Sequence, residues 1–160
     1  VSALLEQASQ KGIPAVIDAD AINALPEGAW PTGLQGVATP HAKEAERWLA
    51  GASPAEALAD CTGESATIVI TGSEDTLTGP EGRFCRATGG HSRMAVGGTG
   101  DLLAGTIGGL LAQGMSAWSA ARLGCALLRE AGTRAAEKTG PGLLAEDVPV
   151  EIARVLAEWT

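Results

Sequence analysis

The stretch AVGGTGDLLAGTIGGLLAQG, from Ala95 to Gly114, places three glycines and one acid at the start of an almost wholly apolar run. We predict a helix from about Asp101 to Gln113. The first N–H groups of a helix have no partners inside it, and the helix dipole adds partial positive charge there. Glycines in front of such a helix let the backbone approach a phosphate closely. Residues Gly97–Gly100 are therefore predicted to form an anion-binding loop.

Asp101 adds a possible proton acceptor to this loop. The pairing suits phosphoryl transfer, in which backbone N–H groups hold the phosphoryl group while the acid takes a proton from the attacking hydroxyl. The loop is not a Walker loop, because no Gly-Lys-Ser/Thr follows, and Leu103 stands where a dinucleotide fingerprint needs its third glycine. The alternative is a glycine-rich turn in which Asp101 is an ordinary first-turn acid.

Strands and helices alternate along the rest of the chain. Apolar runs predict strands within residues 13–20, 36–40 and 66–71, and residues 72–87 predict a strand pair around a turn at Gly79–Gly82. Helical segments are predicted at 1–12, 21–25, 41–51, 53–60, 116–140 and 143–159, with Gly12, Gly51 and Gly140 as stops. This alternation predicts an α/β fold, a mostly parallel sheet with helices on both faces.

Polar residues follow three of the predicted strands. They are Asp18 and Asp20, then His41, then Thr71–Asp75. In parallel sheets, ligands gather beyond the carboxyl ends of the strands, so one crevice is predicted there. Two other interpretations stay open: Asp20 caps the next helix, and His41 with Glu44 forms a solvated first helical turn.

Composition restricts the class of protein. The chain has 160 residues, 45% of them hydrophobic, which is enough for one domain with a core, here taken as residues 1–160. A net charge of -8 argues against nucleic acid or an anionic membrane as main partner, since both favour clustered Lys and Arg. No apolar run is long enough to span a bilayer.

The three cysteines lie far apart without a CxxC pair, which disfavours zinc and a disulfide framework and predicts reduced thiols in a cytoplasmic protein. Helical spacing predicts that Trp48, Trp118, Trp159 and Cys125 lie in the core.

Four stretches resemble one family. They are VIDADAINAL (16–25), TPHAKEA (39–45), RMAVGGTGDLLAGTIGGLLAQG (93–114) and GLLAEDV (142–148). Together they are similar to the ribokinase-like ADP/ATP-dependent NAD(P)H-hydrate dehydratases, repair enzymes often fused to a hydrate epimerase. The GGTGD segment alone marks the wider ribokinase-like superfamily, whereas DADAxN and TPHxxE point to the dehydratases. The resemblance implies a ribokinase-like α/β fold.

The resemblance also implies site residues. His41-x-x-Glu44 is similar to the superfamily's Asn-x-x-Glu motif, which is linked to magnesium and phosphate. The implied set has catalytic Gly98, Thr99, Gly100 and Asp101; substrate-binding His41, Asp20, Asn23 and Asp101; nucleotide-binding Thr71, Gly72, Ser73, Asp75, Gly97 and Gly100; and Glu44 toward a metal.

The implied reaction is dehydration of hydrated NADH or NADPH, with ADP or ATP and Mg²⁺ as cofactors. Phosphorylation would turn the ring hydroxyl into a good leaving group, with Asp101 accepting the proton. The ring nitrogen's lone pair would then help to expel phosphate.

The chain departs from the family pattern in two ways. Many members have Lys-Gly where Thr71–Gly72 stands here, so a positive charge near the nucleotide is lost. The family's domain also begins with further strands, so we expect this chain to be a C-terminal part, weakly active or inactive alone. Its cut sheet edge would be covered by a homo-oligomer or by a missing N-terminal half. The alternatives are a ribokinase-like kinase of a small vitamin-precursor alcohol and a non-catalytic nucleotide-binding module.

Overall fold

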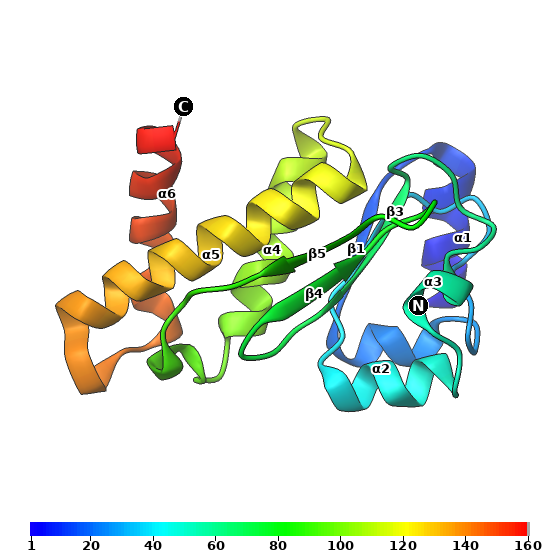
Figure 1. Cartoon of the computed structure of the whole chain (residues 1–160). Helices are drawn as coiled ribbons and strands as arrows, with labels where there is room; N and C mark the ends of the chain where they lie inside the picture. The colour runs from blue at the N-terminus through cyan, green and yellow to red at the C-terminus, as the bar shows by residue number, and fades with distance from the viewer. Residues whose placement is uncertain (160) are drawn as a thin grey trace.

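A computed structural model describes residues 1–159, and its centre is one five-stranded sheet (Figure 1). The strands lie in the order β1-β2-β3-β4-β5. They are β1 (Ala15–Ile17), β2 (Gly36–Ala38), β3 (Ala66–Ile70), β4 (Asp75–Thr78) and β5 (Phe84–Ala87). Strands β1, β2 and β3 are parallel, with Ile17 opposite Ala38 and Ala38 opposite Ile68. Strands β4 and β5 are antiparallel to their neighbours, so the sheet is mixed rather than mostly parallel.

Short connections explain the antiparallel half of the sheet. A parallel return needs a crossover of about a dozen or more residues, and only residues 71–74 separate β3 from β4. The turn between β4 and β5 closes where the Gly79 N–H donates to the Arg83 carbonyl at 2.9 Å. Glu81 and Gly82 adopt left-handed conformations there, with φ of 59° and 75°. The predicted strand pair around Gly79–Gly82 is thus confirmed.

The helices lie close to the predicted segments. They are α1 (Ser2–Lys11), α2 (Ala42–Leu49), α3 (Pro54–Ala57), α4 (Thr99–Ala112), α5 (Ala117–Thr139) and α6 (Val148–Trp159), with 3-10 turns η1 (Ala19–Ala24), η2 (Ser92–Met94), η3 (Gly140–Gly142) and η4 (Ala145–Asp147). Four details differ from the prediction. The last helix begins at Val148 and not near residue 143, and the helix predicted at 53–60 ends at Ala57. Residues 21–25 contribute to a 3-10 turn, and the C-terminal cap of α2 is Ala50, with φ 49°, one residue before Gly51, with φ 99°.

Helices cover both faces of the sheet, as predicted (Figure 1). On one face Val37, Val69 and Leu77 join the apolar cluster of α4, α5 and α6. On the other face Ile17, Ala38 and Ile68 join a cluster that includes Trp30 and Trp48, whose rings lie 6.4 Å apart. No helix in the described part of the chain combines the length and apolar character that a bilayer crossing needs.

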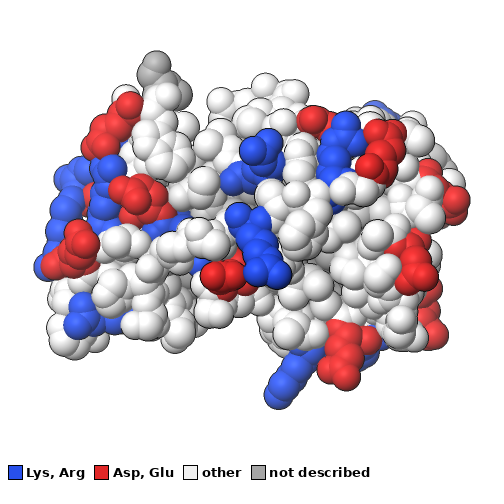
Figure 2. Space-filling model, in the orientation of Figure 1, with Lys and Arg blue, Asp and Glu red and all other residues white. Residues whose placement is uncertain are grey.

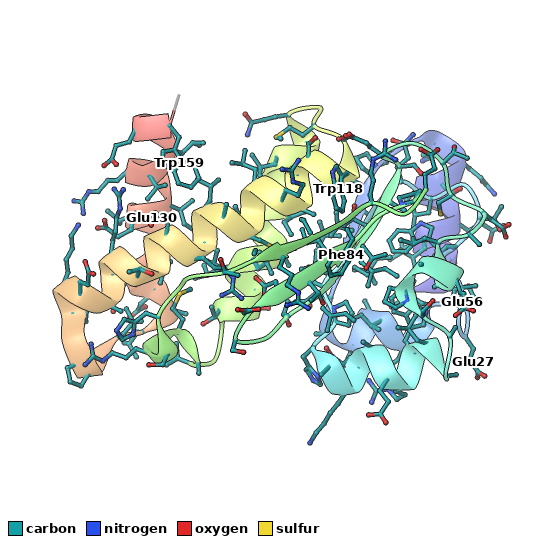
Figure 3. All side chains as sticks on the ribbon, in the orientation of Figure 1. Glu27, Glu56, Phe84, Trp118, Glu130 and Trp159 are labelled. Carbon is teal, nitrogen blue, oxygen red and sulfur yellow. The ribbon has the colours of Figure 1, made fainter. Side chains whose placement is uncertain are left out.

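Three of the four predicted core residues are buried. Trp48, Trp118 and Cys125 have 4%, 8% and 0% of their surface exposed. Trp159 is 49% exposed, so its predicted burial is wrong. The reason lies in the crossing of two helices: α6 runs steeply past α5, and its last turn, with Trp159, projects beyond it (Figures 1 and 3).

Charged side chains are mixed on the surface. On the face shown in Figure 2, Lys and Arg alternate with Asp and Glu over α5 and α6. Arg134, for example, pairs with Glu130 at 2.8 Å and with Glu158 at 2.7 Å. Such pairing leaves that face without a broad patch of basic side chains.

Candidate functional site

The carboxyl ends of β1, β2 and β3 are joined to one another, and the N-terminus of α4 lies against the end of β1. The Thr39 hydroxyl donates to Oδ1 of Asp18 at 2.9 Å, which joins the ends of β2 and β1. The Thr71 N–H donates to the Pro40 carbonyl at 2.9 Å, which joins β3 to β2. A Cβ at Gly100 would lie 3.8 Å from Oδ2 of Asp18, so α4 begins directly against the end of β1. The three strand ends thus lie side by side, with Gly100 against the end of β1, and the crevice that the sequence predicts there stays a prediction.

The glycine loop is held by the Thr99 side chain and is open at Gly97 and Gly100, whereas Ala145 lies against Gly98. Gly98 caps α4 with φ 94°, a conformation that favours glycine. The Thr99 hydroxyl donates to the carbonyl oxygens of Met94 and Val96 at 2.8 and 2.9 Å, so it shapes the loop. A Cβ at Gly97 would meet nothing within 4 Å, and at Gly100 only Asp18 at 3.8 Å. A ligand can therefore approach this backbone closely.

Asp101 lies in the first turn of α4 and is exposed. Within residues 1–159 its carboxylate forms no hydrogen bond or ion pair, in contrast to Asp18, which Thr39 engages. A carboxylate without a hydrogen-bond partner, next to the N–H groups of a helix start, can accept a proton from a group bound there.

His41 and Glu44 form a capping box at the start of α2. Nδ1 of His41 accepts from the N–H groups of Lys43 and Glu44 at 3.1 and 3.3 Å, and Oε2 of Glu44 accepts from the His41 N–H at 2.9 Å. Because Nδ1 is an acceptor, a neutral ring carries its proton on Nε2, which lies 3.5 Å from Oε1 of Glu44. The two side chains form the first turn of α2, but only His41, with 56% of its side chain exposed, is largely solvated; Glu44 is 16% exposed. The ring edge of His41 stays available, and the site pair stays a prediction.

The side chains around Glu44 suit Mg²⁺ better than a metal ion that needs three or more protein ligands. Within residues 1–159 no group of three or more His, Cys, Asp or Glu is arranged to hold a metal ion. Mg²⁺ keeps several waters and commonly takes one or two carboxylates together with substrate phosphates. A single half-buried carboxylate at the strand ends fits that pattern, and the assignment of Glu44 stays a prediction.

The segment between β3 and β4 divides into an exposed and a buried part. Gly72 and Ser73 are exposed, whereas Asp75 is buried. Oδ1 of Asp75 accepts from the Gly72 N–H at 3.2 Å, and Oδ2 pairs with Nε of Arg129 at 2.8 Å. Asp75 thus supports the predicted nucleotide segment from beneath.

Cys125 lies close to this buried carboxylate. Burial, followed by the negative charge of Asp75, raises the pKa of the Cys125 thiol. The thiol stays protonated at neutral pH, so Cys125 is a core residue and not a nucleophile.

Asp20 and Asn23 lie on η1 and are exposed. Asn23 borders a small hollow of about 160 Å³ with Arg47 and Trp48 of α2. No hydrogen bond within the described residues links Asp20 or Asn23 to Gly97–Asp101. A second hollow of about 450 Å³, between α1 and residues 24–32, contains none of the predicted site residues.

Two residues that build the site, Asp18 and Arg129, are absent from the set that the sequence implies. Asp18 was noted at a strand end, but its position against Gly100 follows only from the packing of α4 on β1. The sequence carries one signal for Arg129: it is a basic residue on the helix face that buries Cys125, Leu128 and Gly132. Its partners lie 40 to 57 residues away in sequence, so local patterns do not reveal them.

Fold and site together define a ribokinase-like α/β protein. A ribokinase-like superfamily protein from Enterococcus faecalis has 26% identity and a TM-score of 0.65, covering 96% of this chain and 58% of that one. The ADP/ATP-dependent NAD(P)H-hydrate dehydratase of Bacillus subtilis, co-crystallised with ATP/Mg²⁺, has the same fold, with a TM-score of 0.74, 23% identity and coverage of 92% and 55%.

Residues 1–154 match the family model described as NAD(P)H-hydrate dehydratase, and the chain belongs to this family. The ADP-dependent (S)-NAD(P)H-hydrate dehydratase of Xanthomonas campestris is 33% identical over 97% of this chain and 56% of its own length. The bifunctional NAD(P)H-hydrate repair enzyme of Coxiella burnetii is 37% identical over 91% of this chain and 31% of its own length. The chain thus spans about half or less of the length of these curated relatives.

Proposed function

We propose that this chain takes part in the dehydration of hydrated NADH or NADPH, driven by ADP or ATP. One observation carries the proposal: the glycine-lined start of α4, where the Asp101 carboxylate has no partner among the described residues, lies against the end of β1, which Thr39 joins to the end of β2. Membership of the NAD(P)H-hydrate dehydratase family supports the substrate class. The names of relatives support the nucleotide, since the one from Xanthomonas campestris specifies ADP.

The chain's residues divide the chemistry among them. The N–H groups at Gly97–Gly100 hold the phosphoryl group and stabilise the charge that develops on it. The oxygen of the ring hydroxyl forms a bond to phosphorus while the nucleotide's own P–O bond breaks, and Asp101 accepts the hydroxyl proton. The C–O bond then breaks with phosphate as leaving group, pushed by the ring nitrogen's lone pair. His41 contacts the substrate with its exposed ring edge, and Asp20 and Asn23 border the substrate on the same side of the sheet.

The nucleotide lies along Thr71, Gly72 and Ser73, over the buried Asp75. Glu44 would hold Mg²⁺, which neutralises phosphate charge when bound. We place the reaction in the cytoplasm, where the unpaired Cys61, Cys85 and Cys125 stay reduced. The open edge of β1 would be covered by a second copy or by further sequence of the same enzyme.

The test is an absorbance assay at the NADH band with the chain, hydrated NADH, Mg²⁺, and ADP or ATP. We expect a nucleotide-dependent rise that Asp101→Asn reduces by about 100-fold or more, as the loss of a general base does. Asp60→Asn, which removes an exposed carboxylate outside the site, serves as the matched control and keeps the rate.

Each other outcome has a distinct meaning. Full activity of Asp101→Asn would overturn the role of that residue. A phosphorylated product without recovery of NADH would indicate a kinase. Nucleotide binding without any turnover would indicate that the start of α4 keeps its anion site while the chain alone does not complete the substrate site, as also expected of a binding module.

A further inference from the structure

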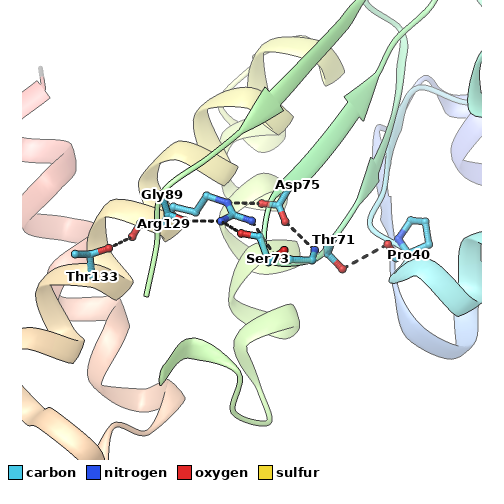
Figure 4. Close-up of polar contacts among 8 residues, drawn as sticks. Pro40, Thr71, Ser73, Asp75, Gly89, Arg129 and Thr133 are labelled. Carbon is cyan, nitrogen blue, oxygen red and sulfur yellow. Dashed lines mark hydrogen bonds and ion pairs between the residues drawn. The ribbon is translucent and has the colours of Figure 1, made fainter. Parts of the chain in front are cut away.

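Arg129 reaches from α5 to the underside of the segment between β3 and β4 (Figure 4). Its side chain is only 11% exposed, and Nε lies 2.8 Å from Oδ2 of Asp75. Nη1 donates to the carbonyls of Ser73 and Gly89 at 2.8 and 2.6 Å, and Nη2 donates to the Gly72 carbonyl at 3.0 Å. One guanidinium thus holds a carboxylate and three backbone carbonyls.

These contacts close a ring around Gly72. Its N–H donates to Asp75, Asp75 pairs with Arg129, and Arg129 donates back to the Gly72 carbonyl. A buried, hydrogen-bonded ion pair is costly to break from one side, because the remaining charge stays buried without a partner. Residues 72–74 are otherwise exposed, so this ring fixes the direction of their peptide groups.

The same face of α5 also fixes the segment that leads into the glycine loop, from Gly89 to Met94. Gly89, which Arg129 engages, precedes η2. Met94 at the end of η2 lies against Gly132, one turn after Arg129, where a Cβ would come within 1.7 Å of its sulfur. The Met94 carbonyl in turn accepts from the Thr99 hydroxyl at 2.8 Å. Helix α5 therefore sets the spacing between residues 72–75 and the start of α4.

We propose that Arg129 is a positioning residue that holds residues 72–75 in the conformation that receives the adenine nucleotide. The proposal rests on the proposed function. Residues Thr71–Asp75 contain no Lys or Arg, so any contact that they make to a nucleotide relies on backbone groups and hydroxyls. The direction of those groups depends on Arg129, which lies beneath them and does not touch the nucleotide itself.

The test measures the Kd of ADP and ATP by calorimetry for the 160-residue chain and for Arg129→Gln and Arg129→Lys. We expect both variants to bind at least about tenfold more weakly at full stoichiometry, since a lysine cannot span a carboxylate and three carbonyls as the planar guanidinium does. The matched control is Arg122→Gln on the same helix, whose guanidinium lies over the Trp118 ring at 5.8 Å; it keeps the affinity.

Stoichiometry separates positioning from folding. A purely structural role would lower the number of binding sites and leave the Kd of the folded fraction unchanged, which would overturn the proposal, as would unchanged binding by Arg129→Gln. Where that variant does not fold, Asp75→Asn replaces it, because its amide oxygen still accepts from Gly72 while the charge partner of Arg129 is lost. Unchanged affinity in Asp75→Asn would likewise overturn the proposal. Absence of nucleotide binding by the unsubstituted chain would instead overturn the proposed function.

Discussion

Two glycines in neighbouring helices are expected to respond oppositely to the same substitution. A Cβ at Gly124 of α5 would lie 2.6 Å from Cγ1 of Ile107, which is fully buried and stiff at χ1. Gly124→Ala should therefore destabilise the chain by about 1–3 kcal/mol through overpacking. Gly105 of α4 is exposed, with nothing within 4 Å of a Cβ, so Gly105→Ala should stabilise by about 0.5–1 kcal/mol. Urea unfolding measures both, and stabilisation by Gly124→Ala would contradict the close approach of α4 and α5.

Single residues also mark what the sequence could predict and what it could not. Helical spacing places Trp48 and Cys125 on a buried face, and both are buried. The same spacing fails for Trp159, because its exposure depends on where α6 passes the end of α5. Arg129 is the strongest example, since its partners come from two distant segments, residues 72–75 and Gly89, that only the folded sheet brings together.

At the scale of elements, the pairing of α5 with α6 should depend on pH. The Glu151 side chain is 5% exposed; it accepts from Nζ of Lys138 at 2.7 Å and from Nη1 of Arg154. These hydrogen bonds, that from Lys138 first, hold the pKa of Glu151 below its ordinary value of 4.5. A lowered pKa in the folded state stabilises the protein above the unfolded value, and this stabilisation is lost as pH falls through the folded value.

We therefore expect the Tm difference between the unsubstituted chain and Glu151→Gln to be constant at neutral pH and to shrink below about pH 4.5. Thermal unfolding by circular dichroism across this range measures the difference. Glu46→Gln, which removes an exposed carboxylate from α2, should leave the Tm unchanged at each pH. A Glu151 difference that stayed constant to the lowest pH would show that its carboxylate does not hold the two helices together.

The turn that connects β4 and β5 could be predicted from the sequence, whereas the register of β1 with β2 could not. A short turn with Gly79 and Gly82 indicates an antiparallel pair, because such a turn cannot accommodate a crossover. The start of α4 was also predicted closely, at Asp101 against the observed Thr99. The pairing of Ile17 with Ala38 has no such local signal, since it depends on the packing of helices on both faces.

For the whole molecule, the residues of the proposed site come from the start of α4 and from segments that follow β1, β2 and β3, so a bound nucleotide should stabilise the entire sheet. Binding only to the folded state at 100 times the Kd adds about 2.7 kcal/mol. For a chain of this size that corresponds to a Tm increase of about 5–10 °C. We expect ADP with Mg²⁺ to give this increase, measured by thermal unfolding at rising ADP concentration.

The two ends of α4 offer a matched pair of variants for this measurement. Gly98 and Gly114 have similar left-handed conformations, with φ of 94° and 89°, so alanine at either should cost about 1–2 kcal/mol. Both variants should lower the Tm without ADP. Only Gly98→Ala also adds a side chain beside the anion loop, 3.1 Å from Cβ of Ala145, so it alone should lose most of the ADP-dependent increase. Equal loss in Gly114→Ala would mean that the response follows general stability, and an intact increase in Gly98→Ala would place the phosphates away from the start of α4.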